Sequence, residues 1–179
     1  MTAPATADLR FPVGKFEPPP LPLTPAQRTA MIAEIARAPA HFRTAVAGLT
    51  DAQLDTPYRD GGWTVRQVAH HIPDSHSNAV TRFKLGLTEE TPTIKPYMED
   101  RWATLADSNG PIEPSLQMLD GLHARWVLLL EAMTPGDFAR TINHPASGTA
   151  PLDRFLALYA WHGRHHTAHV TSLRARMGW

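Results

Sequence analysis

Apolar residues recur at helical spacing in four long segments of the chain. Within each segment they lie three or four positions apart, which at about 100° per residue places them in one stripe along a helix. The segments cover residues 25–48, 63–87, 114–133 and 152–176, and a short helical piece is expected near residues 100–106. Four long helices joined by short connections predict an all-α protein built as a four-helix bundle.

Threonine and proline positions refine the first two helices. Thr24 supplies an N-cap oxygen and Pro25 suits the first helical position, so the first helix is expected to begin there. A proline in a helix interior removes a backbone donor and crowds the preceding turn. Pro39 is therefore expected to kink the first helix, and Pro73 to interrupt the second.

Residues 1–23 are expected to form an extended N-terminal arm. Prolines, which fix φ and remove backbone donors, are frequent in this segment, and its apolar residues show no period. The arm is expected to lie over the bundle, which residues 24–179 form. Residues 143–151 are expected to be a loop, and no run of alternating polar and apolar residues predicts a β-strand.

The charge balance limits the kinds of partner that we expect, and the N-terminal segment limits the cellular compartment. The chain has 17 basic and 17 acidic residues and a formal net charge of zero, so it lacks the basic surface typical of proteins that bind nucleic acids or anionic membranes. The N-terminal segment has no apolar stretch of the kind found in signal peptides or membrane spans. We therefore expect a soluble cytoplasmic protein whose partners are small molecules or a second copy of the chain.

Histidine is abundant and cysteine is absent. The absence of cysteine excludes thiolate metal sites, a catalytic cysteine and disulfides. Ten histidines occur in 179 residues, and four of them lie in the run 162–169. Residues four apart on a helix lie on one face about 6 Å from each other, so an H-x-x-x-H spacing lets two imidazoles bind one metal. Two overlapping pairs have this spacing, His162 with His166 and His165 with His169.

Helical phase separates the two pairs. With His162 at zero, the apolar residues of the last helix fall between about −40° and +80°, and His166 falls near +40°. His169 lies near the edge of this stripe and His165 beyond it. The first pair is therefore predicted to face the bundle interior, where each imidazole needs a hydrogen bond or a metal. A pair of hydrogen-bonded core histidines is the alternative.

A third ligand is expected from the second helix, which offers three candidates, His70, His71 and His76. Phase favours His76, because it shares a face with apolar residues, whereas His71 lies off that stripe. A kink at Pro73 would make the phase unreliable. The residue pattern leaves the choice among the three open.

Five motifs in a fixed order carry a family resemblance. They are Gly61–His76, Arg82–Leu85, Pro92–Tyr97, Leu122–Trp126 and Tyr159–His166. Together they resemble the YfiT branch of the DinB-like superfamily, and the similarity runs from about Leu9 to the C-terminus. The resemblance implies a four-helix bundle, a homodimer and a three-histidine metal site.

The resemblance also implies the ligands. In that superfamily the first ligand follows the helix-opening tryptophan by eight residues, which corresponds to His71, and the other two form the H-x-x-x-H, here His162 and His166. Three imidazoles without a thiolate suit one Zn²⁺ or Ni²⁺ per chain, and three protein ligands leave a position open for catalysis. Asp74, about one turn after His71, is a candidate to orient it by a hydrogen bond, or else an ordinary solvated carboxylate.

The resemblance implies two kinds of reaction. Family members are described as metal-dependent hydrolases, and related members transfer a low-molecular-weight thiol such as bacillithiol to an electrophile. Because the chain has no cysteine, the thiol would have to be a cosubstrate. We favour thiol transfer to a small electrophile, with hydrolysis by metal-activated water, or a non-enzymatic stress-related metal-binding protein, as alternatives. Arg82 and Lys84 are candidates to bind an anionic substrate, or else ordinary solvated charges of a helix, and no residue is assigned as the catalytic acid or base.

Overall fold

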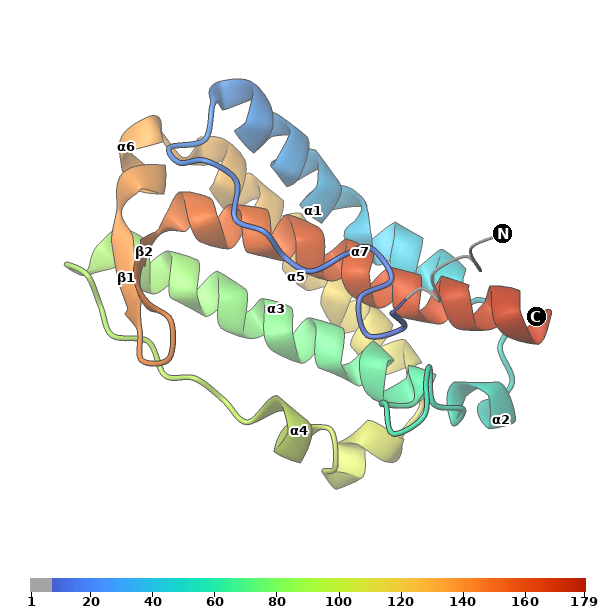
Figure 1. Ribbon diagram of the computed structural model, residues 1–179. Coiled ribbons are helices and arrows are strands. Elements are labelled where there is room, and N and C mark those ends of the chain that lie inside the picture. Colours follow the sequence, from blue (N-terminus) through green and yellow to red (C-terminus); the bar gives the residue numbers. More distant parts are fainter. Residues whose placement is uncertain (1–7) are drawn as a thin grey trace.

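Four long helices form the bundle that the sequence predicted. The computed structural model describes residues 8–179. The long helices are α1 (Pro25–Val46), α3 (Val65–Thr88), α5 (Glu113–Ala132) and α7 (Leu152–Met177). α1 packs on α7 and α5, and α3 packs on the same two helices, so the four close into a ring (Figure 1). Each helix begins and ends within a few residues of its predicted bounds.

Short elements connect the long helices. They are α2 (Asp51–Leu54), α4 (Glu99–Trp102), the 3₁₀ helix η1 (Ala106–Asn109) and α6 (Pro135–Ala139). α4 corresponds to the short helical piece expected near residues 100–106, whereas α2 and α6 were not predicted. Within residues 8–179, no helix combines the length and the apolar character that crossing a membrane requires.

The predicted loop at residues 143–151 is wrong in part, because this segment belongs to a β-hairpin. β1 (Thr141–His144) pairs antiparallel with β2 (Gly148–Pro151). Strands of four residues are too short for an alternating pattern to be recognised. The buried side chain of Ile142 packs on α3 at Gly86, where a Cβ atom would lie 2.9 Å from Ile142 Cγ2. A larger residue at position 86 would therefore displace Ile142 of the hairpin or Leu152 of α7.

Four helices begin with the same capping box. In each, a threonine side chain accepts a hydrogen bond from the backbone three residues later, and that residue's side chain accepts one from the threonine backbone. The pairs are Thr24 with Gln27, Thr50 with Gln53, Thr64 with Gln67, and Thr134 with Asp137. Thr64 thus fixes where α3 begins, nearly two turns before the buried histidines His70 and His71.

Prolines lie inside two of the long helices. α1 continues past Pro39 and α3 continues past Pro73, so the prediction that Pro73 interrupts its helix is wrong. The residues around Pro73 are buried against other helices, and this packing outweighs the lost backbone hydrogen bond.

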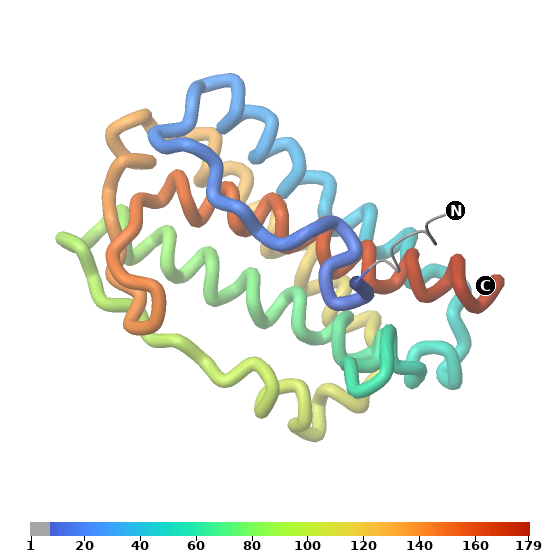
Figure 2. The backbone as a smooth tube through the Cα atoms, in the orientation of Figure 1, coloured from blue at the N-terminus to red at the C-terminus, as the bar shows by residue number. Residues whose placement is uncertain are grey.

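Residues 8–23, the described part of the predicted N-terminal arm, lie along α7 (Figure 2). The carbonyl of Arg10 accepts a hydrogen bond from His169 Nε2 at 3.2 Å, and the carbonyl of Gly14 accepts one from Trp161 Nε1 at 3.2 Å. Residues 1–7 of the predicted arm lie outside the described residues. The described part of the arm thus covers Trp161, His165 and His169 of α7.

The apolar core consists of two clusters with buried histidines between them. One cluster includes Phe83 and Trp126, and the other includes Phe42 and Leu119. Each long helix contributes to both clusters. Along α3, α5 and α7, the chain passes from one cluster to the other across buried histidines, among them His76, His123 and His166.

A buried ion pair joins α1, α7 and the arm. Arg28 contacts Asp153 with two nitrogens, Nε to Oδ1 and Nη2 to Oδ2, each at 2.7 Å. The Leu23 backbone N–H donates to Asp153 Oδ2 at 3.0 Å. The Asp153 side chain is 1% exposed, so these donors replace nearly all of its hydration.

Replacing Asp153 with alanine is expected to destabilise the fold strongly, because Arg28 would remain buried without its partner. The loss of unfolding free energy in urea should be roughly 3–5 kcal/mol. Arg43, which bridges Glu113 and Asp120 on the surface, provides the control. Arg43→Ala should cost at most about 1 kcal/mol. Equal losses in the two variants would contradict this account.

Candidate metal centre

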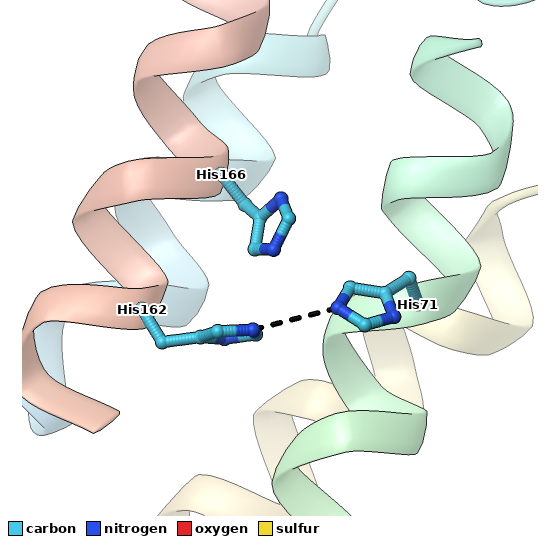
Figure 3. Close-up of side chains that lie close together, drawn as sticks. All are labelled: His71, His162 and His166. Carbon is cyan, nitrogen blue, oxygen red and sulfur yellow. Dashed lines mark hydrogen bonds between the residues drawn. The ribbon is translucent and has the colours of Figure 1, made fainter. Parts of the chain in front are cut away.

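Three histidines from two helices converge on one point. His71 comes from α3, and His162 and His166 come from successive turns of α7 (Figure 3). One nitrogen of each residue lies within 4.8 Å of the other two. His71 Nε2 and His162 Nε2 are 3.4 Å apart, and the His162 and His166 ring centroids are 4.5 Å apart. The structure therefore brings together the three residues that the family resemblance implied as ligands.

Burial keeps these imidazoles neutral. Desolvation, with a smaller contribution from His165, lowers the pKa of His71 to about 4. Desolvation and the neighbouring histidines hold the pKa values of His162 and His166 well below the usual range. A metal binds the neutral form of imidazole, so each ring is ready to bind without losing a proton near pH 7.

The spacing and the donor type fit a divalent transition metal. A separation of 3.4 Å between His71 Nε2 and His162 Nε2 is too long for a good N–H···N hydrogen bond. Two nitrogens bound tetrahedrally at about 2.0–2.1 Å from one zinc would lie about 3.4 Å apart. Imidazole nitrogens suit zinc and nickel, and three protein ligands leave a further position for another molecule.

The histidines open onto a cavity of about 820 Å³ that also contains polar side chains. Arg82 and Tyr97 line it, and Arg82 Nη1 donates to the hydroxyl of Tyr159 at 2.8 Å. Burial raises the pKa of Tyr97 to about 12, so its phenol keeps its proton. Of the two predicted cations, Arg82 faces the cavity and Lys84 is exposed to solvent. The cavity lining thus includes two arginines, Arg59 and Arg82, and three tyrosines, Tyr58, Tyr97 and Tyr159, beside the histidines.

The other two histidines of the run are also buried, which corrects the phase prediction for His165. Their side chains are covered by Trp161 of α7 itself and by segments outside the four long helices. Phe11 of the arm lies 6.1 Å from the His165 ring and Trp161 stacks on it at 4.3 Å, while Tyr58 stacks on His169 at 4.0 Å. The periodicity of one helix cannot reveal that a distant segment covers its outer face.

The three candidates from the second helix have different surroundings. His71 joins His162 and His166. His70 contacts Ser115 Oγ of α5 at 2.7 Å and lies outside the three-histidine group. His76 lies in the core, as its phase predicted, where it contacts His162 at 3.0 Å. Phase correctly predicted that His76 is buried. It could not distinguish a buried histidine of the core from one that belongs to the three-histidine group.

Asp74 lies half-buried on α3. Burial and the nearby Asp107 raise the pKa of its carboxyl. Within residues 8–179, no hydrogen bond joins the Asp74 carboxylate to His71, and the Asp74 backbone carbonyl accepts from Asn78 Nδ2 at 2.9 Å. The structure thus shows no hydrogen bond through which Asp74 would orient His71.

Comparison with known proteins identifies the family. The model of the DinB superfamily matches residues 34–170, a segment that contains all three histidines. The chain belongs to the DinB superfamily. Two relatives, from Bacillus mycoides strain KBAB4 and Bacillus cereus strain B4264, are each 54% identical over 96% of this chain and 99% of their own length. Both carry the name "Putative metal-dependent hydrolase".

A solved structure of similar sequence has the same fold. It is YfiT from Bacillus subtilis, described as "a probable metal-dependent hydrolase with an unusual four-helix bundle topology". The two chains are 47% identical, the match covers 96% of this chain and 98% of YfiT, and the TM-score is 0.93. The predicted family and the predicted bundle are therefore both confirmed.

The buried histidines predict that the metal-free protein loses stability in mild acid. Burial lowers the pKa of His71 and His165 to about 4 from an ordinary value of 6.5. Between pH 6.5 and 4 the unfolded chain therefore binds more protons than the folded one, and unfolding becomes easier as the pH falls. Each such histidine contributes about 1.4 kcal/mol per pH unit in this window.

Urea unfolding of chelator-treated protein at several pH values from 7.5 to 5 measures this effect. The unfolding free energy should stay constant above pH 7 and fall below about pH 6.5. His165→Gln removes one of these groups and should make the slope shallower. A stability that does not change across the range would contradict the neutral state of these imidazoles.

Proposed function

We propose that the protein is a metal-dependent enzyme that acts on a small electrophile. It holds one Zn²⁺ or Ni²⁺ per chain through His71, His162 and His166, and the substrate occupies the adjoining cavity. The observation that carries this proposal is the convergence of three neutral imidazoles at the wall of a cavity that also contains Arg82. The names of the relatives support a metal-dependent activity.

The residues around the histidines have roles that follow from their chemistry. When bound, such a metal supplies Lewis acidity, which activates a water molecule or a thiol as the nucleophile. Arg82 provides a positive charge that pairs with a carboxylate or another anionic group of a substrate. Tyr97 keeps its proton and donates a hydrogen bond to a substrate oxygen. The same residues would orient either nucleophile.

We favour transfer of a low-molecular-weight thiol over hydrolysis. In this reaction the thiol sulfur forms a bond to the electrophilic carbon, the leaving group departs with its bonding electrons, and the thiol proton passes to the leaving group or to solvent. The chain contains no cysteine, so the sulfur comes from a cosubstrate such as a bacillithiol-like thiol. Arg82 would then bind an anionic group of the thiol. Hydrolysis is the alternative that the names of the relatives favour.

Elemental analysis of the purified protein tests the metal site. The unmodified chain should contain about one zinc or nickel ion per molecule. His71→Ala and His166→Ala each remove a ligand and should lose most of it. His70→Ala, which replaces the neighbouring buried histidine outside the site, should retain it. Absence of metal from the unmodified protein after reconstitution with Zn²⁺ or Ni²⁺ would overturn the proposal.

Turnover assays separate the three functional hypotheses. The metal-loaded protein is incubated with an aryl halide and with an activated ester, each with and without a low-molecular-weight thiol. We expect turnover only when the thiol is present, and at least tenfold less in His166→Ala, because that variant lacks a ligand. Turnover in water alone would support hydrolysis. Metal binding without turnover on either compound would support a non-enzymatic metal-binding protein.

A further inference from the structure

A continuous chain of hydrogen bonds links His162 to the backbone of α1. His162 Nδ1 contacts His76 Nε2 at 3.0 Å, and His76 Nδ1 contacts His123 Nε2 at 2.7 Å. His123 Nδ1 contacts the carbonyl oxygen of Ile35 at 2.7 Å. His76 is fully buried and His123 is 2% exposed, so bulk water does not compete for these contacts. Neither residue belongs to the three-histidine site or lines the cavity beside it.

The Ile35 carbonyl is free to accept because of a proline. In an α-helix the carbonyl of residue 35 accepts a hydrogen bond from the N–H of residue 39. Residue 39 is proline and has no N–H, so the helix leaves this carbonyl without a donor. His123, which comes from α5, supplies the missing donor. Pro39 therefore has a definite consequence for the core besides any effect on the shape of α1.

The Ile35 carbonyl determines which atom donates and which accepts in every hydrogen bond of the series. A carbonyl oxygen only accepts, so the proton of His123 lies on Nδ1. A neutral imidazole has one N–H, so His123 Nε2 accepts, and the proton of His76 lies on its Nδ1. His76 Nε2 then accepts from His162 Nδ1 by the same argument. Both rings are buried in the bundle core, where a charged imidazole is disfavoured, so each is neutral.

The series of hydrogen bonds ends at His162, whose other ring nitrogen, Nε2, faces the three-histidine site. With its proton on Nδ1, His162 has a lone pair on Nε2, and this atom lies 3.4 Å from His71 Nε2. A solvated neutral histidine favours the other tautomer, with the proton on Nε2. That tautomer would direct an N–H toward the metal position and prevent binding.

We propose that His76 and His123 are positioning residues that hold His162 in the Nδ1–H tautomer and so direct its Nε2 lone pair to the metal. The hydrogen-bond chain starts at the Ile35 carbonyl, three hydrogen bonds away from the metal ligand and on a different helix. This inference rests on the proposed metal site. It assigns a role to two buried histidines that the sequence analysis did not include among the ligands.

The tautomers can be measured directly in the metal-free protein. Long-range ¹⁵N–¹H correlation spectra of chelator-treated, ¹⁵N-histidine-labelled protein distinguish Nδ1–H from Nε2–H rings. We expect the Nδ1–H form at His123, His76 and His162. An Nε2–H tautomer at His162 would overturn the proposal. The spectra need no metal, so they decide the hydrogen-bond chain even if the unmodified protein fails to bind metal and the proposed function is wrong.

Zn²⁺ affinity, measured by competition with a chelator, tests the consequence for binding. His123→Leu removes the acceptor for His76 without touching a ligand, and should weaken binding about 10- to 100-fold. His123→Gln supplies an amide oxygen as acceptor and should recover part of this loss. His70→Leu replaces a buried histidine of α3 that takes no part in this series of hydrogen bonds, and it should leave the affinity unchanged. Equal affinities in His123→Leu and the unmodified protein would overturn the proposal.

Discussion

The need to satisfy buried imidazoles in the middle of the bundle is the constraint on which the rest of the structure depends. The histidines separate two apolar clusters, and each of the four long helices contributes residues to both clusters. A neutral imidazole has one donor and one acceptor, and an unpaired one in the core costs free energy. Each helix must therefore be placed both for apolar packing and for hydrogen bonding, which leaves little freedom in its register against its neighbours.

Several features outside the histidine layer serve this constraint. Pro39 leaves a carbonyl of α1 free, and His123 donates to it, so a residue that would ordinarily weaken a helix supplies an acceptor in the core. The arm supplies the Arg10 carbonyl to His169 of α7. The Arg28–Asp153 pair holds the end of the arm and α1 against α7. The arm and α1 thus complete the surroundings of α7 from two sides.

The long helices could be predicted from the sequence because the period of their apolar residues reflects burial along their whole length. The hairpin could not, since Ile142 is the one residue of β1 that is fully buried and strands of four residues show no period. At the site, spacing and phase found His162 and His166, but the choice of His71 needed the family resemblance. His123 lies in one of the family motifs, but its role could not be predicted, because it depends on how α5 is placed against α1 and α3 in the folded protein.

The site is asymmetric, and this asymmetry joins the fold to the proposed chemistry. On the core side of His162, His76 and His123 form contacts of 2.7 to 3.0 Å in the buried interior, which hold the ring in one orientation. On the other side, the same ring lines a cavity with Arg82, Tyr97 and Tyr159. A histidine that is hydrogen-bonded on its core side keeps its ring orientation while small molecules enter and leave the cavity on its other side. The bundle interior thus provides rigidity and the cavity provides access, and His162 is the residue at which the two meet.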